Sequence, residues 1–113
     1  MNKIELLNHK QEAEFHLLNE LFPFWTARMI DRENGGYLTH FDKDGNDSGE
    51  DEKSLIAQTR CLYTCASAHR AGYGNGLFAE MAKHGVDFLI NKMWDKEHGG
   101  FYWMMDRDRK SVV

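Results

Sequence analysis

The chain has 113 residues, of which 42% are hydrophobic and 12% aromatic, a composition typical of one globular unit and not of a disordered segment. Its formal net charge of −4 provides no basic surface for nucleic acid. The sequence has no apolar run near the roughly 18 residues of a membrane span and begins without a signal-peptide pattern, so we expect a soluble, cytoplasmic protein.

The first predicted helix lies in the N-terminal 25 residues. Pro23 interrupts its pattern, so we expect either a kink there or a break, with Pro23 opening a final short turn. The apolar residues of this helix fall on one stripe, at spacings of three, four and eight: Ile4, Leu7, Phe15, Leu18, Leu21, Phe22 and Trp25.

Two further helices are predicted between Ser48 and residue 93. Ser48 precedes Asp51 by three positions in a loose capping box, which predicts the start of the first of them, and Gly72 predicts its end. Asn75 is the expected N-cap of the next helix, whose apolar stripe is wide.

Segments 29–45 and 93–109 repeat each other at an offset of 64 positions. Seven positions are identical, among them a leading Met, an Asp, a Glu and a Gly-Gly pair. The period of the repeat corresponds to two helices. Such a pair cannot bury its apolar faces alone, so the pattern predicts units that stack or close into a ring.

After each Gly-Gly pair the side chains alternate in character, which predicts a short strand. In the first copy Asp44 and Gly45 then predict a hairpin turn, whereas Arg109 stands in place of this glycine in the second copy.

The acidic pairs before the glycines, Asp31/Glu33 and Asp95/Glu97, lie where a carboxylate can accept exposed backbone N–H groups. Both copies carry this set, so we interpret it as part of the repeat architecture and not as acid-base catalysts.

No metal site is expected. A calcium loop starting at Asp42 fails, because its sixth position is Asp47 where glycine is needed and its twelfth is Lys53 where glutamate is needed. The six histidines form no HxH or HExxH spacing, which is typical of solvated surface residues. Cys61 and Cys65, four positions apart, fit buried small side chains in a reducing cytosol better than ligands.

Residues outside the repeat are the better candidates for function. Arg60 lies in the middle of a helix among apolar residues, near the face of Ile56 and Tyr63, where a buried guanidinium would need a polar or anionic partner. An internal ion pair is the structural alternative. The aromatic residues after the glycines predict either a sugar-stacking platform or, more commonly, packing: Tyr37, Phe41, Phe101, Tyr102 and Trp103.

Four segments taken in order carry a family likeness: LFPFW, MIDRENGGYLTHFDKDGN, EKSLIAQTRCLY and MWDKEHGGFYWMMDRDRK. The sequence resembles the superfamily of N-acylglucosamine 2-epimerases and cellobiose 2-epimerases, which includes ketose-aldose isomerases acting on mannose. The resemblance implies an all-α fold in which residues 1–113 are a single segment, the N-terminal quarter of an (α/α)6 barrel. About three helices are then expected, with short β-hairpins after the Gly-Gly motifs.

The resemblance also implies a chemistry. Such isomerases invert C2 of an aldose, or move its carbonyl between C1 and C2, through an enediolate and without a cofactor. The family's active-site arginine matches Arg60 through the pattern Lys-x4-Gln-x-Arg, and its aromatic sugar-binding residue matches Tyr102, with Trp103 beside it. The two acid-base histidines of the family have no counterpart here, so we expect a fragment of an isomerase that is inactive alone.

Two other interpretations stay open: a non-catalytic carbohydrate-binding remnant, and an assembly element completed by another chain. The expected partners are a sugar substrate, but no nucleic acid and no membrane. Amphipathic helices taken from a ring leave apolar faces uncovered, so self-association is expected as well.

Overall fold

The computed structural model describes residues 1–50 and 52–106. No helix in this part of the chain has the length and apolar character that crossing a membrane requires. The elements follow one another as α1 (Lys3–His16), a π-helical turn (Leu17–Leu21), α2 (Phe22–Arg28), β1 (Lys53–Ser54), α3 (Leu55–Arg70), a 3-10 turn (Gly74–Gly76), α4 (Leu77–Phe88), a second π-helical turn (Leu89–Met93) and β2 (Met104–Met105).

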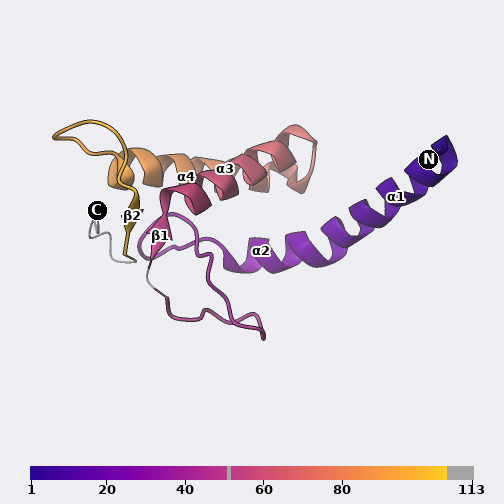
Figure 1. The fold of residues 1–113 in the computed structure, drawn as a ribbon, viewed down its shortest axis with the longest axis horizontal. Coiled ribbons are helices and arrows are strands. Elements are labelled where there is room, and N and C mark those ends of the chain that lie inside the picture. Colours follow the sequence, from indigo (N-terminus) through magenta and orange to yellow (C-terminus); the bar gives the residue numbers. More distant parts are fainter. Residues whose placement is uncertain (51, 107–113) are drawn as a thin grey trace.

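α1, the first π-helical turn and α2 form one long, slightly curved helix, while α3 and α4 lie side by side (Figure 1). The three predicted helices are therefore present. Pro23 lies in the first turn of α2. Proline has no N–H to donate backwards, and the π-helical turn just before it, closed by the Phe22 N–H on the Leu17 carbonyl, accommodates this loss. Pro23 thus opens a final short helical stretch.

Both predicted N-caps are wrong. The cap of α3 is Ser54, whose hydroxyl accepts the Ala57 N–H at 3.1 Å, whereas the Ser48 N–H donates to the His40 carbonyl in a hairpin. Asn75 lies inside the 3-10 turn with a φ of 49°, and α4 begins only after it. Ser48 is engaged in the hairpin, and Gly76 stands at the cap position of α4 with no side-chain cap hydrogen bond.

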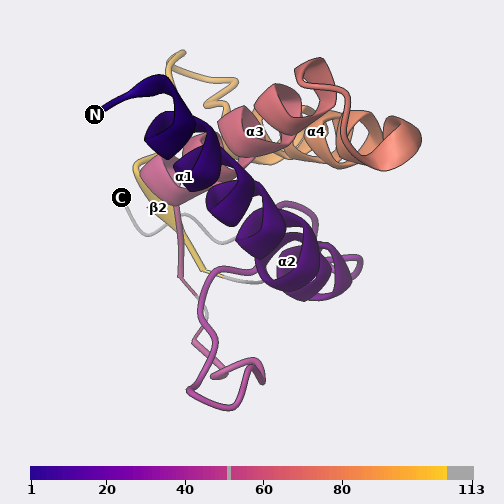
Figure 2. The ribbon, with the colours of Figure 1, turned by 90° about the vertical axis from the view of Figure 1, so that its right-hand side faces the viewer.

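The predicted hairpin turn in the first copy is confirmed. The Asp42 N–H donates to the Asn46 carbonyl at 2.8 Å, Gly45 has a φ of 83°, and Phe41 pairs with Asp47. The loop that contains this turn lies below the helices in the view of Figure 2. The corresponding turn of the second copy, with Arg109, lies outside the described residues.

The short strand predicted after the second Gly-Gly pair is present as β2, with a partner that the sequence did not predict, whereas the segment after the first pair forms only isolated bridges. β1, just before α3, pairs antiparallel with β2, so that Lys53 lies opposite Met105 and Ser54 opposite Met104. The pairing joins the residues just before α3 to the segment that follows α4 (Figure 1). It fixes where the residues after the second Gly-Gly pair lie relative to α3.

The two Gly-Gly segments, here called the first corner (residues 29–38) and the second corner (residues 93–102), have the same backbone. Each aspartate N–H donates to the carbonyl of the second glycine, Asp31 to Gly36 at 3.1 Å and Asp95 to Gly100 at 2.8 Å. Each aspartate side chain accepts the N–H groups two and three positions later, at 2.9–3.1 Å. The predicted repeat is confirmed, and so is the structural interpretation of both aspartates.

Tyr37 fastens the first corner to α3 and α4. Its side chain is fully buried and its hydroxyl donates to the Met81 carbonyl at 2.6 Å. Gln58 accepts the Tyr37 N–H and donates to the Tyr37 carbonyl, each at 2.8 Å, like a paired strand. A Cβ on Gly85 would lie 2.1 Å from the tyrosine oxygen, so only glycine permits this approach.

A buried ion pair completes the first corner. The Lys53 ammonium donates to Asp31 at 2.5 Å and to the Gly35 carbonyl at 2.6 Å, and both charged side chains are at most 6% exposed. Burial would raise the pKa of the Asp31 carboxyl, but the hydrogen bonds from Lys53 and from the Asn34 N–H outweigh it and lower that pKa. The His84 Nε2 is 2.8 Å from the Gly36 carbonyl and therefore carries the proton.

The apolar core has two parts, one beside each corner. The first contains Met29, Tyr37, Cys65, Ala68, Phe78 and Met81. The second contains Phe88, Leu89, Met93 and Met105.

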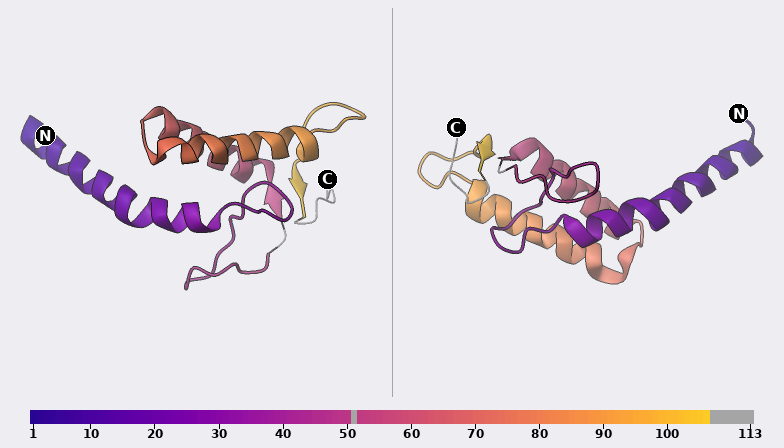
Figure 3. Two further views of the ribbon diagram at one scale, coloured as in Figure 1. Left: turned by 180° about the vertical axis from the view of Figure 1, so that it is seen from behind. Right: turned by 90° about the horizontal axis from the view of Figure 1, so that it is seen from below.

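α1 contributes nothing to this core. It has no buried residue, and its predicted apolar stripe is open, with Ile4 71%, Leu7 47% and Phe15 65% exposed. A 3.3 Å hydrogen bond from the Tyr73 hydroxyl to Glu14 links α1 to the helix pair. The helix projects away from the rest of the molecule (Figure 3).

Replacing Asp31 by asparagine is expected to lower the free energy of unfolding by about 3 kcal/mol, because Lys53 would stay buried without its anion. Urea unfolding at pH 7 measures this. The folded-state pKa of Asp31 lies below its ordinary value of 3.8, so its stabilisation is present above pH 3.8 and is lost as the pH falls through the folded value. The wild type should therefore lose more stability on acidification than the variant.

Asp95→Asn is the matched control, since it removes the same charge from the same local hydrogen bonds at the second corner, where the described residues supply no lysine. Its loss of stability should be clearly smaller. Equal losses in the two variants would show that the ion pair contributes nothing beyond the local turn.

The open stripe of α1 is expected to cause concentration-dependent association, because contiguous apolar surface of this kind favours contact with other molecules. Replacing Leu7 and Phe15 together by glutamate should shift sedimentation toward the monomer. The control is the pair Asn8→Glu and Gln11→Glu, which adds the same charge at exposed polar positions. A strictly monomeric wild type with a sharp cooperative melt would refute the expectation.

Candidate functional site

Arg60 lies on the exposed side of α3. The buried side of this helix carries Gln58, Cys65 and Ala68, whereas Ile56 and Arg60 belong to the opposite, solvent-facing side. In the part of the chain that the structure describes, the guanidinium makes no hydrogen bond or ion pair. Arg60 is exposed among the described residues, so burial there does not force an internal partner on it.

Trp103 is brought next to this helix by the strand pair. The Leu55 N–H, at the first residue of α3, donates to the Trp103 carbonyl at 3.0 Å. Arg60 follows Leu55 by five residues, which is about 7.5 Å along a helix axis. The Trp103 side chain is 52% exposed. Arg60 thus lies about one and a half helical turns along α3 from Leu55, the residue that Trp103 contacts, and both Arg60 and Trp103 are exposed.

Tyr102 has a different environment from its neighbour. Its N–H donates to the Met93 carbonyl at 2.8 Å, and its half-buried side chain packs against the second core cluster. Successive residues of an extended segment point to opposite sides, so Tyr102 covers the core where Trp103 faces solvent. The alternation ends at Met105, which is buried because β2 pairs with β1 there.

The side chains of Arg60 and Trp103 have complementary chemistry. A guanidinium is permanently charged and presents several donors in a plane, which suits an oxygen that becomes anionic during a reaction. An indole presents a flat apolar face, on which the C–H face of a sugar ring can stack. This arrangement can bind and polarise a hydroxylated ligand, but it contains no acid-base group of its own.

The histidines do not supply that group near Arg60. His84 is used in the first corner, while His16 and His98 contact Glu20 at 3.0 Å and Asp95 at 3.4 Å. Residues 1–50 and 52–106 contain no cluster of three histidine, cysteine or acidic side chains that would hold a metal ion.

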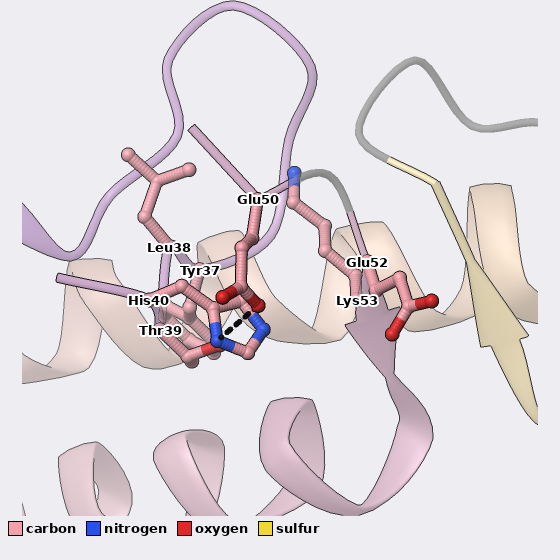
Figure 4. A pocket seen from close by; sticks show the side chains of 7 residues that line it. All are labelled: Tyr37, Leu38, Thr39, His40, Glu50, Glu52 and Lys53. Atoms are coloured by element: carbon pink, nitrogen blue, oxygen red, sulfur yellow. Dashed lines mark ion pairs between the residues drawn. The ribbon is translucent and has the colours of Figure 1, made fainter. Parts of the chain in front are cut away.

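A small hollow lies beside the first corner, where His40 pairs with Glu50 at 3.4 Å (Figure 4). Its volume of about 10 Å³ gives room for little more than one water molecule. It is too small for a sugar. Its lining residues are Tyr37, Leu38, Thr39, His40, Glu50, Glu52 and Lys53.

A larger cavity of about 250 Å³ lies between α2, α3 and α4. No charged side chain lines it, so it lacks the polar partners that a sugar requires. Burial, together with the neighbouring Cys65, raises the pKa of the Cys61 thiol to about 11, and burial raises that of Cys65 as well. Both thiols are therefore protonated near neutral pH and are poor nucleophiles and metal ligands. The lining is Phe22, Trp25, Met29, Cys61, Thr64, Cys65 and Phe78.

The sequence analysis missed the roles of Lys53 and Gln58. They belong to the same pattern, Lys-x4-Gln-x-Arg, that drew attention to Arg60, yet they bind the first corner. A signal for them was present in the sequence, because Lys53 and Gln58 stand at fixed distances along the chain from the first corner that they bind. The pattern therefore combines two fastening residues with one exposed arginine.

Comparisons with known proteins agree with this geometry. Residues 36–113 match the family model described as N-acylglucosamine 2-epimerase (GlcNAc 2-epimerase). Cellobiose 2-epimerase of Bacteroides fragilis is 34% identical over 103 residues, which cover 86% of this chain and 24% of that protein.

Solved structures extend the comparison to the fold. Cellobiose 2-epimerase from Spirochaeta thermophila superposes with a TM-score of 0.85 at 23% identity, over 98% of this chain and 27% of that one. A D-mannose isomerase superposes with a TM-score of 0.77 at 24% identity, over 90% and 25%. These similarities show the fold, which is the helical architecture of part of an (α/α)6 barrel.

The fold is the helical architecture of the carbohydrate epimerases and isomerases that the chain matches. The chain belongs to the N-acylglucosamine 2-epimerase family. It spans about a quarter of the length of the curated relatives that it matches.

Proposed function

We propose that residues 1–113 form the N-terminal quarter of one (α/α)6-barrel domain of a sugar 2-epimerase or aldose-ketose isomerase in the cytoplasm. The observation that carries the proposal is an exposed Arg60 on α3, the helix whose first residue bonds the Trp103 carbonyl, on a chain of this family. Related proteins are named for cellobiose and for mannose, so the substrate class is an aldose with a free carbonyl end.

The reaction begins with the ring-opened sugar. A base removes the proton from C2, and the electron pair forms the C1–C2 double bond while the carbonyl oxygen at C1 becomes anionic. Return of a proton to the other face of C2 gives the epimer, whereas its return to C1, with transfer of the hydroxyl proton from O2 to O1, gives the ketose. Arg60 donates to the oxygens at C1 or C2 and stabilises the enediolate, which needs no cofactor.

Trp103 and Tyr102 hold the sugar ring in this proposal. Trp103 presents the more exposed side chain, and Tyr102 supports the segment from the core side. The acid and the base belong to histidines outside residues 1–113. A second candidate, a non-catalytic carbohydrate-binding remnant, would use the same residues, and an assembly element completed by another chain would not need Arg60 at all.

The 113-residue chain alone is expected not to turn over sugars, because the exposed arginine and tryptophan have no acid-base partner. The measurement is deuterium incorporation at C2 of mannose, glucose or cellobiose in heavy water. Enzyme-dependent exchange by the pure chain would refute the expectation and would require a base among these residues.

In the complete enzyme, Arg60→Ala should reduce turnover roughly 100-fold, equivalent to about 3 kcal/mol of transition-state stabilisation. Arg60→Lys should recover only part of this, since one ammonium cannot reproduce a planar bidentate donor. Steady-state turnover and the melting temperature are measured on the same preparations.

Arg70→Ala, at an exposed arginine near the end of α3, is the matched control and should leave turnover unchanged. A structural arginine would behave in the opposite way. Arg60→Ala would then lower the melting temperature while turnover per folded molecule stayed near that of the wild type.

A further inference from the structure

The side chain of Tyr63 is free in the part of the chain that the structure describes. The hydroxyls of Tyr37 and Tyr73 donate within the chain, at 2.6 and 3.3 Å, and Tyr102 packs on the second core cluster. Tyr63 is instead 74% exposed, and within residues 1–50 and 52–106 its hydroxyl has no hydrogen-bond partner. Its ring and its hydroxyl are therefore available to a ligand.

Helix geometry places Tyr63 beside Arg60. Both residues lie on the exposed side of α3, three positions apart. Cβ atoms at this spacing are roughly 5–6 Å apart on one face of a helix. Side chains in a helix lean toward its N-terminus, so the Tyr63 ring extends over the turn that carries Arg60. The phenol and the guanidinium are therefore within reach of the same small ligand.

The other hydroxyl groups of α3 near Arg60 are engaged or distant. The hydroxyls of Thr59 and Thr64 donate to carbonyls of the helix itself, at 2.9 and 3.0 Å. Ser67 follows Arg60 by seven residues, which is about 10.5 Å along the helix axis, and its side chain is short. Tyr63 thus supplies the free hydroxyl of α3 that lies nearest to Arg60.

The helix axis also orders the groups that would meet a substrate. The Trp103 carbonyl accepts the N–H of Leu55 at the start of α3. Arg60 lies about 7.5 Å and Tyr63 about 12 Å along the axis from Leu55. A sugar whose ring end is held by the Trp103 segment, as in the function proposed above, directs C1, its terminal carbon, past Arg60 toward Tyr63.

We propose that Tyr63 is a further substrate-binding residue of this site, an inference that rests on the proposed function. Its phenol donates to the oxygen at C1 of the open-chain aldose, beside the guanidinium of Arg60. That oxygen gains negative charge when the proton leaves C2, and a hydrogen bond strengthens when its acceptor becomes anionic. Tyr63 therefore binds the enediolate better than the aldose, and its contribution belongs to kcat more than to KM.

Tyr63→Phe in the complete enzyme tests this, because it removes the hydroxyl and keeps the ring. We expect kcat for the aldose to fall about tenfold, with KM and the melting temperature close to those of the wild type. Steady-state kinetics with mannose and with cellobiose, and thermal unfolding of the same preparations, measure this. A lower melting temperature with unchanged turnover per folded molecule would show a packing role and would overturn the proposal.

Tyr73→Phe is the matched control, since it removes the hydroxyl that bonds Glu14, away from Arg60. Its turnover should equal that of the wild type. Arg60→Ala, measured alongside, separates the two levels of the argument. A roughly 100-fold loss in Arg60→Ala with full turnover in Tyr63→Phe would overturn the role of Tyr63 alone. Full turnover in Arg60→Ala would overturn the proposed function itself.

Two replacements of Tyr63 decide the case in which Tyr63→Phe does not fold. Para-aminophenylalanine and O-methyltyrosine both keep the ring and a polar atom at its end, but only the first can donate a hydrogen bond. The enzyme with para-aminophenylalanine at position 63 should keep the higher kcat. Equal kcat in the two enzymes would overturn the proposal.

Discussion

The burial of the backbone N–H and carbonyl of Tyr37 determines how the rest of this chain is arranged. A backbone corner that enters a helix interface brings polar groups that must be satisfied there. Gln58 satisfies them as a neighbouring strand would, and Lys53 neutralises the carboxylate that shapes the turn. Because both residues flank the start of α3, the same contacts set the position of that helix relative to the corner.

Close approach is the second part of this constraint. Gly36 lies against Gln58 and Phe88, and Gly85 lies under the Tyr37 ring, so neither position tolerates a Cβ. The tyrosine hydroxyl then reaches the Met81 carbonyl inside α4. One side chain thereby ties the corner to a helix 44 residues further along the chain, and the helix pair needs no long sheet to hold it.

The sequence revealed the features that are local and periodic. The repeat, the helical stripes and the structural aspartates follow from spacing and from the backbone preferences of glycine, and the structure has them. The cap at Ser48 was wrong because several polar residues near the start of α3 compete and hairpin pairing engages Ser48, and the cap at Asn75 was wrong because the left-handed Gly76 follows it at the start of α4. The strand after the second Gly-Gly pair was predicted, but its pairing with β1 was not, because a two-residue strand such as β1 carries almost no periodic signal.

At the candidate site, the direction in which each side chain points was harder to predict than which residues form the site. Arg60 was identified by its context, but apolar neighbours in sequence did not bury it, since they point to several sides of α3. Tyr102 and Trp103 are adjacent, and only the register between β1 and β2 decides which of them faces solvent. That register depends on contacts between segments some 50 residues apart, which no local pattern encodes.

Two copies of one corner in different surroundings separate local from tertiary contributions to the structure. The turn hydrogen bonds, the positive φ angles and the aspartate caps occur at both corners, so they do not require the helix pair. The buried lysine, the glutamine clamp and the enclosed aromatic ring occur only at the first among the described residues. The geometry of the corner is therefore local, and the burial of the first corner comes from the donors of the helix pair that packs on it.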